Sequence, residues 1–153
     1  CYHRGCSEID RGQYDILEDV DYAPGSSLMI RKKVLEEIGS FNEKFFMYFE
    51  DVDICVRAKK EGYRVVYVPS SRIFHKERSF EKGRGHTKIF SYYIARNTLY
   101  FFNSQGKIKP FSFLKWLLTN LRSNATSISR FKFYLKGVVD FFLGKIGREP
   151  SVR

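Results

Sequence analysis

A dense aromatic segment constrains the fold of this chain more than any other feature. Residues 41–49 read Phe-Asn-Glu-Lys-Phe-Phe-Met-Tyr-Phe, and we expect them to pack rather than face water, because each ring carries a large apolar area. The acidic run Glu50-Asp51-Val52-Asp53 follows directly, at the start of a predicted helix that extends to about Glu61. Acids are favoured in a first turn because the helix dipole is positive there. The sequence therefore predicts packed aromatic residues that place acidic side chains at a helix N-terminus.

Predicted elements around this segment alternate between strand and helix. They are a strand at Leu28–Ile30, a helix at Arg31–Ile38 that Gly39 ends, the helix from Glu50, a strand at Arg64–Val68 that Pro69 ends, a short extended piece at Arg72–His75, and a helix from about Thr87 to Asn103. This order indicates an α/β domain. Two or three strands are too few for a complete sheet, and the chain begins at Cys1 without an initiator Met. We therefore expect a piece of a longer protein that lacks the N-terminal half of the domain.

The last third of the chain differs from the rest in charge. We divide the chain at Gly106, into a domain over residues 1–106 and a tail over residues 107–153 with amphipathic helices at Phe111–Leu121 and Ser129–Leu143. The tail carries ten cationic and two anionic side chains, which gives it +8 of the total charge of +10. Such asymmetry is typical of a tail that faces an anionic surface, either lipid or nucleic acid. A soluble tail that is merely basic is the alternative.

Both tail helices combine a large apolar face with Lys and Arg, a pattern typical of helices that lie in a membrane interface. The alternative is that these faces pack on the domain or on each other. No stretch of the sequence approaches the roughly 18 to 20 apolar residues of a membrane-spanning helix.

The three cysteines give a weaker signal. Cys55 lies in an apolar helical stretch and is expected to be a buried thiol. Cys1, His3 and Cys6 could touch one metal ion, but no second ligand pair follows them. Reduced cysteines in a cytoplasmic protein are the plain inference.

The acidic pair Glu50-Asp51 and a histidine are candidates for chemistry. A helix N-terminus beside a cleft keeps a carboxylate ionised, and an ionised carboxylate can accept a proton from a hydroxyl. His75 follows 24 positions after Asp51, and a neutral imidazole near a carboxylate can bind a metal or make a second polar contact.

Four blocks of the sequence occur in a characteristic order. They are Tyr22–Arg31 with its Gly-Ser turn, the run Phe41–Ala58, the segment Gly62–Pro69 followed by His75, and the helical run Tyr92-Tyr93-Ile94-Ala95-Arg96-Asn97. Together these blocks resemble family 2 glycosyltransferases, especially the rhamnosyltransferase-like members, over roughly residues 20–103. The resemblance implies a GT-A fold, of which this chain holds the C-terminal half, a nucleotide-diphosphate sugar donor, and inversion at the anomeric carbon.

The resemblance also implies roles for individual residues. In the family the Asp of the Glu-Asp pair is the general base, which corresponds to Asp51, and a downstream histidine that corresponds to His75 completes a site for a divalent metal, Mg²⁺ or Mn²⁺. Glu50 is expected to cap the helix or to orient the acceptor beside the base. The Asp-x-Asp motif that supplies the other metal ligands has no suitable counterpart here. The nucleotide-binding half is therefore expected to be absent and this piece alone to be inactive.

The remaining candidates would bind substrate, and each has a structural alternative. Backbone N–H groups of Gly25 and Ser26 would line the sugar pocket, or these residues form a plain tight turn. Arg84 lies in a charged loop that would close over the donor phosphates, or that loop is simply solvated. Arg96 would reach a phosphate, or pair with an acid on its own helix. Asp53 is expected to be solvated or salt-bridged rather than catalytic.

The expected function is transfer of a sugar to a hydroxyl of a saccharide or lipid-linked saccharide acceptor in cell-envelope glycan synthesis. The tail would hold the enzyme peripherally at the anionic inner face of the cell membrane, on the cytoplasmic side, without binding nucleic acid. The rival hypothesis is a non-enzymatic basic module that binds membranes or nucleic acid, which leaves Glu50, Asp51 and His75 unexplained. A third is a scaffold with an inactive transferase half.

Overall fold

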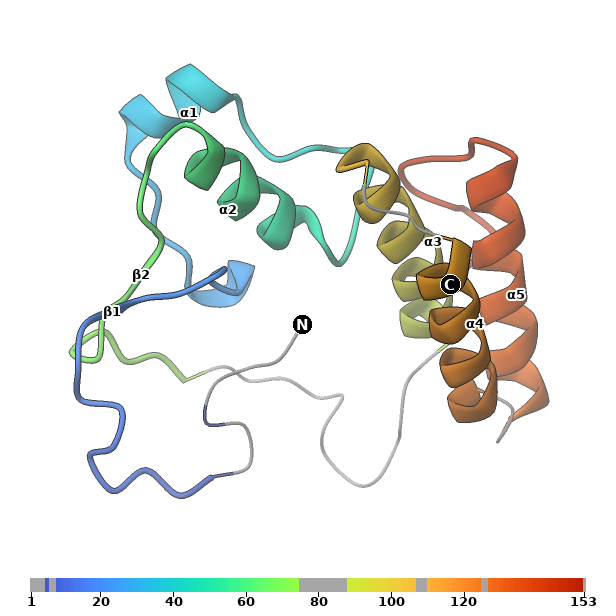
Figure 1. Ribbon diagram of the computed structural model, residues 1–153, viewed down its shortest axis with the longest axis horizontal. Coiled ribbons are helices and arrows are strands. Elements are labelled where there is room, and N and C mark those ends of the chain that lie inside the picture. Colours follow the sequence, from blue (N-terminus) through green and yellow to red (C-terminus); the bar gives the residue numbers. More distant parts are fainter. Residues whose placement is uncertain (1–4, 6–7, 75–87, 107–109, 125–126, 153) are drawn as a thin grey trace.

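The computed structural model describes residues 5, 8–74, 88–106, 110–124 and 127–152, and these residues form two groups of elements (Figure 1). The first group contains β1 (Glu18–Asp19), a 3-10 turn (Gly25–Ser27), α1 (Lys32–Ile38), α2 (Glu50–Lys60) and β2 (Val66–Tyr67). The second group is a layer of three helices, α3 (Lys88–Ser104), α4 (Pro110–Asn124) and α5 (Ile128–Phe142). The aromatic segment runs from α1 to the helical layer and back into α2, so it joins the two groups.

A two-stranded antiparallel sheet is the only sheet among the described residues. In this sheet β1 pairs with β2, with Glu18 opposite Tyr67 and Asp19 opposite Val66. The exposed guanidinium of Arg64 donates to both carboxylate oxygens of Asp19, at 2.8 and 3.0 Å. Two short strands rarely stand alone, so this sheet depends on what packs against it.

The strand predictions are only partly confirmed. Of the predicted strand Arg64–Val68, only Val66–Tyr67 is paired, and residues 72–74 are not in a strand. The predicted strand at Leu28–Ile30 is wrong. Leu28 has extended backbone angles (φ −110°, ψ 121°), but no described residue pairs with this segment. An extended segment becomes a strand only when a neighbouring strand satisfies its N–H and C=O groups.

The bounds of the first two helices agree with the predicted bounds to within about one residue. Gly39 ends α1 with a φ of 78°, and its N–H donates to the carbonyl of Leu35 at 2.9 Å. Three acids occupy the first turn of α2, as predicted. The same helix buries Cys55, which confirms the prediction of a buried thiol.

The predicted long helix is confirmed as α3, which is buried on nearly every side. Its buried residues are Ser91, Tyr92, Tyr93, Ala95, Arg96, Asn97, Thr98, Leu99 and Phe101. A helix buried all round must pack between other elements. The aromatic segment contacts α3 through Phe45, whose ring lies 5.2 Å from that of Tyr100, and α5 packs along another side. Gly137 of α5 permits this close packing, because a Cβ there would lie 2.4 Å from the carbonyl oxygen of Tyr92.

Both predicted tail helices are confirmed as helices, and α5 packs on α3. The ring of Tyr134, which is buried, lies 5.9 Å from that of Trp116 on α4. After α5 the chain returns to the aromatic segment, where the N–H of Gly147 donates to the carbonyl of Lys44 at 2.8 Å. The inner face of α5 therefore packs on the rest of the protein, which is the alternative to a membrane-facing surface. The domain boundary at Gly106 stays a prediction. None of the helices in the described part of the chain is long and apolar enough to cross a bilayer.

Candidate active site at the N-terminus of α2

The carboxylate of Asp51 is held by backbone N–H groups on both of its oxygens. Oδ2 accepts from the N–H of Gly25 at 3.0 Å, and Oδ1 accepts from the N–H of Val52 at 2.8 Å. Gly25 approaches closely enough for this bond because the turn at Gly25–Ser27 lies beside the first turn of α2; a Cβ added to Gly25 would lie 3.7 Å from the Cβ of Asp51. The N-terminal end of a helix also favours a negative charge. The carboxylate of Asp51 is therefore half-buried and fixed in orientation.

The N–H of Gly25 is thus engaged by Asp51 within the chain itself. Ser26 is exposed, and the N–H of Ser27 closes the turn on the carbonyl of Pro24 at 2.9 Å. In the structure this turn contacts Asp51 through the N–H of Gly25. Binding of sugar by Gly25 and Ser26 stays a prediction.

Glu50, next to Asp51, is half-buried and has an unsatisfied carboxylate oxygen. Its Oε2 is buried and has no hydrogen-bond partner among the described residues. Burial raises the pKa of the Glu50 carboxyl; a hydrogen bond from its own backbone N–H opposes this, and the charge of Asp51 adds to it. The two adjacent acids therefore sit in different environments: Asp51 is held by N–H donors and Glu50 is poorly solvated.

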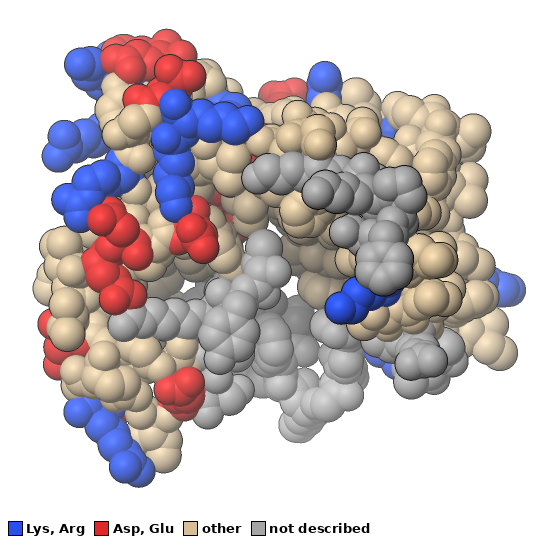
Figure 2. Space-filling model, viewed as in Figure 1, with Lys and Arg blue, Asp and Glu red and all other residues tan. Residues whose placement is uncertain are grey.

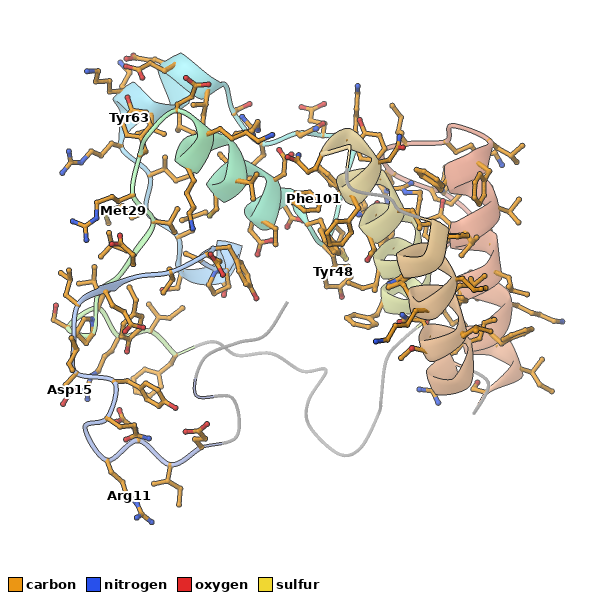
Figure 3. All side chains as sticks on the ribbon, in the orientation of Figure 1. Arg11, Asp15, Met29, Tyr48, Tyr63 and Phe101 are labelled. Atoms are coloured by element: carbon orange, nitrogen blue, oxygen red, sulfur yellow. The ribbon has the colours of Figure 1, made fainter. Side chains whose placement is uncertain are left out.

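A large open hollow lies beside these two acids, between the first group and the helical layer. Its volume of about 2780 Å³ exceeds the roughly 300 to 1,000 Å³ of a closed ligand pocket, so it is a groove rather than an enclosed cavity. Its lining is mainly apolar and aromatic and includes Tyr22, Tyr48, Phe49, Phe90 and Trp116. Figure 3 shows Tyr48 and Phe101 where the aromatic segment meets α3.

The structure buries Arg96 away from the surface. Its side chain is 2% exposed, and its guanidinium lies over the rings of Tyr92 and Tyr93, at 5.3 and 4.9 Å from their centroids. One of its nitrogens, Nη2, donates to the carbonyl of Phe45 at 3.2 Å. These contacts are neither a phosphate site nor an ion pair with an acid of its own helix. Binding of substrate by Arg96 stays a prediction to which this location gives no support.

Asp53, the third acid of the run, has a structural role, as predicted. It is 5% exposed and accepts from Nε of Arg57 at 2.8 Å. Arg57 in turn donates to the carbonyls of Ile38 at 2.5 Å and Ser40 at 2.8 Å. Asp53 and Arg57 therefore join α2 to the end of α1.

Tyr22 lies near the acids but was not predicted as a site residue from the sequence. The phenol of Tyr22 lies in the hollow, and burial raises its pKa, with a further contribution from the charge of Asp51. The sequence signal that could have indicated Tyr22 is its position at the start of the block Tyr22–Arg31.

The metal site cannot be built from the described residues. His75 and Arg84 lie outside them, as do Cys1, His3 and Cys6. In the described ranges no group of three or more His, Cys, Asp or Glu side chains is placed to hold a metal ion. Glu50 and Asp51 alone do not fit the oxygen-rich shell of Mg²⁺. We therefore derive no step through a metal.

Comparison with known proteins agrees with the sequence resemblance. The chain is 43% identical over 56 residues to an N-acetylglucosaminyl-diphospho-decaprenol L-rhamnosyltransferase of Mycobacterium tuberculosis, a match that covers 37% of this chain and 18% of that protein. It is 44% identical over 54 residues to the low-salt glycan biosynthesis hexosyltransferase Agl10 of Haloferax volcanii, covering 35% of this chain and 18% of that protein. The rhamnosyltransferase WbbL of Escherichia coli is 34% identical over 86 residues, or 52% of this chain and 33% of WbbL.

These matches therefore span only 18 to 33% of the length of these three relatives. No solved structure matches the chain. The family described as glycosyl transferase family group 2, whose domains have a GT-A type α/β fold, matches residues 9–143, which is most of the chain. The chain belongs to glycosyl transferase family group 2.

Proposed function

We propose that this chain is the acceptor-side half of an inverting glycosyltransferase in which Asp51 is the general base. The observation that carries the proposal is the double N–H contact to Asp51 at the edge of the hollow. A carboxylate oxygen can accept more than one hydrogen bond, so each oxygen keeps acceptor capacity for an incoming hydroxyl. The acceptor oxygen bonds to the anomeric carbon as its proton passes to Asp51. The bond from that carbon to the diphosphate oxygen breaks on the opposite face.

The names of the relatives support a substrate class. Rhamnosyltransferases and a hexosyltransferase of glycan biosynthesis are among them, and one name gives a sugar-diphospho-decaprenol acceptor. We extend this class to the present chain: a nucleotide-diphosphate sugar as donor and a saccharide or lipid-linked saccharide as acceptor, in cell-envelope glycan synthesis. The comparisons give no support to the rival hypothesis of a basic nucleic-acid-binding module.

Exposed apolar residues on the first group support the proposal that the nucleotide-binding half of the domain lies outside this chain. Met29 is 97% exposed and Phe74 is fully exposed, and Figure 3 shows Met29 pointing away from the helical layer. The extended segment at residues 28–30 is apolar and has no strand beside it among the described residues. A preceding half of the domain would cover these side chains and supply that strand, as well as the Asp-x-Asp metal ligands. His75 would complete the Mg²⁺ or Mn²⁺ site there, and Arg84 would contact the donor phosphates.

Glu50 has a role beside the base in this scheme. Its buried oxygen Oε2 has no hydrogen-bond partner in the described part of the chain, and a carboxylate oxygen can accept a hydrogen bond. An acceptor sugar in the hollow offers hydroxyl groups that can donate to this oxygen. Glu50 would therefore orient the acceptor while Asp51 removes its proton.

The outer surface of the helical layer supports peripheral attachment to a membrane. Its exposed apolar residues are Leu114, Leu118, Ile128, Leu135, Val139, Phe142 and Leu143. Figure 2 shows that charged side chains gather over the first group, whereas the helical layer presents mainly uncharged atoms on this face. Apolar helix surfaces with Lys at their edges suit the anionic inner face of a cell membrane, on the cytoplasmic side. Such attachment would bring Asp51 near a lipid-linked acceptor.

Replacement of Asp51 by Asn in the full-length protein tests the proposed base. Asn keeps an oxygen for the N–H of Gly25 but cannot take up the proton, so turnover should fall by about 10²- to 10⁴-fold with little change in donor KM. Glu61→Gln is the matched control, because Glu61 is an exposed acid directly after the same helix and should be dispensable. Retention of more than about a tenth of the wild-type turnover by Asp51→Asn would exclude Asp51 as the base.

A further inference from the structure

The aromatic segment that leads into α2 has an unusual backbone. Phe46, Tyr48 and Phe49 all have positive φ angles, of 59°, 65° and 76°. This left-handed region favours glycine, and a bulky residue there is strained. Three such residues within four positions persist only when their surroundings hold the backbone in place. Phe49 is also the N-cap of α2, so this strained backbone runs directly into Glu50 and Asp51.

A single buried amide on α3 binds this backbone. Nδ2 of Asn97 donates to the carbonyl oxygens of Phe45, Met47 and Tyr48, at 2.8, 2.7 and 2.9 Å. An amide has two N–H groups, so one of them is shared between two of the three carbonyls. Asn97 is 1% exposed, and its contacts cross 49 to 52 positions of sequence. One side chain therefore holds three carbonyls of the four-residue turn from Phe45 to Tyr48.

Arg96 fixes the orientation of this amide. Its Nε donates to Oδ1 of Asn97 at 3.0 Å, which leaves Nδ2 directed at the carbonyls. Its Nη2 donates to the carbonyls of Phe45 and Lys44, at 3.2 and 3.4 Å. Its guanidinium also lies over the rings of Tyr92 and Tyr93, which are themselves nearly perpendicular to each other. Arg96 and Asn97 together bind the aromatic segment through its backbone, independently of its ring contacts.

We propose that Asn97, oriented by Arg96, is a positioning residue that places Asp51 for proton removal. The inference rests on the proposed role of Asp51 as base. Tyr48, whose carbonyl Asn97 holds, lies three residues before Asp51, and the carbonyl of Phe49 accepts from the N–H of Asp53 at 2.8 Å in the first turn of α2. Release of the segment would shift that turn relative to Gly25, and with it the carboxylate that Gly25 orients.

A double-mutant cycle in the full-length protein tests this positioning role. Asn97→Ala should lower kcat by about 10- to 100-fold with a smaller change in donor KM, because displacement of a catalytic group by about 1 Å is enough for such a loss. In the Asp51→Asn background the same change should cause little further loss, because the residue through which Asn97 acts is already gone. Arg96→Lys should lower kcat in the same direction by a smaller factor, since it keeps the charge but loses the planar guanidinium that holds Asn97.

Leu99→Ala controls for lost stability. Leu99 is 3% exposed on the same helix and does not line the hollow, so its truncation should lower the melting temperature while leaving kcat per folded molecule within about twofold. Wild-type kcat in Asn97→Ala, or an equal loss in the wild-type and Asp51→Asn backgrounds, would overturn the positioning role. If Asn97→Ala does not fold, Arg96→Lys is judged by the same two criteria. Wild-type turnover in Asp51→Asn would instead overturn the base itself, which keeps the two failures apart.

Discussion

The two groups of elements differ in how they hold two of their acids, Asp140 and Glu50. The helical layer encloses a buried carboxylate, Asp140, which accepts from Lys136 at 2.5 Å, pairs with Lys145 at 3.0 Å, and accepts from the hydroxyl of Tyr92 at 3.0 Å. In the first group Glu50 is half-buried, and its Oε2 has no hydrogen-bond partner among the residues that the structure describes. The helical layer therefore holds its buried acid through ion pairs and supports the aromatic segment, whereas the acids that we assign to chemistry lie on the first group.

The largest effect on stability is expected at the buried carboxylate of the helical layer. Asp140→Asn should lower the free energy of unfolding by roughly 3 kcal/mol, the low end for a buried ion pair that loses one partner, because both lysines are partly exposed. Chemical denaturation at pH 7 measures the loss. If Asp140→Asn unfolds like the wild type, the helical layer does not depend on this cluster.

The same cluster predicts how stability depends on pH. Burial alone would raise the pKa of Asp140, but hydrogen bonds from Lys136, Lys145 and Tyr92 outweigh burial and lower it below its ordinary value of 3.8. The stabilisation is therefore fully present above pH 3.8 and is lost as the pH falls through the lowered pKa. For Asp140→Asn, the free energy of unfolding should therefore fall less than for the wild type as the pH is lowered through this range.

An intermediate effect is expected on the outer surface of the helical layer. Leu114 and Leu118 on α4 are 51% and 52% exposed, and changing both to Gln should weaken binding to anionic vesicles about tenfold or more, because each buried Leu contributes roughly 1.5–3 kcal/mol. Leu17→Gln is the control, since Leu17 is as exposed but lies on the first group. Sedimentation with anionic and neutral vesicles at low and high salt gives the readout. Equal binding by both variants, or no binding by the wild type, would remove the membrane role.

The smallest effect is expected at Glu50. Its raised pKa means that the folded state holds the proton more tightly than the unfolded state, so stability falls as the pH rises from 4.5 through the folded pKa. Glu50→Gln should remove this decline and stabilise the protein at pH 7 by at most about 1 kcal/mol, since the carboxyl is only half-buried. Melting temperatures between pH 4.5 and pH 7, with Glu61→Gln as control, measure it. Parallel curves for the wild type and Glu50→Gln would show that burial of Glu50 carries no cost.

The helices and the acidic helix start were predictable from sequence, whereas the contacts that hold them were not. Apolar periodicity and Gly39 set the bounds of α1, and the acids of α2 follow the helix dipole, because both signals are local. The bonds from Asn97 to the aromatic segment and from Gly25 to Asp51 join distant residues through backbone groups. Backbone donors and acceptors are the same at every position, so they leave no pattern in the sequence. The resemblance marked the run that contains Arg96 and Asn97, but not what the two residues bind.

The strand at Leu28–Ile30 failed for a related reason. Local propensity shows that a segment can be extended, and Leu28 is extended. Pairing needs a neighbouring strand, and no described residue supplies one. Sheet structure therefore depends on the whole protein in a way that the helices of this chain do not.

The most direct test of this account is to measure turnover and melting temperature together for Asp51→Asn and Asp140→Asn in the full-length protein. The account predicts that Asp51→Asn loses about 10²- to 10⁴-fold in kcat at nearly unchanged melting temperature. Asp140→Asn should melt earlier but keep its kcat per folded molecule at a temperature where it is folded. Wild-type turnover in Asp51→Asn, or a loss of kcat in Asp140→Asn as large as in Asp51→Asn, would contradict the division between a helical support and a catalytic α2 N-terminus.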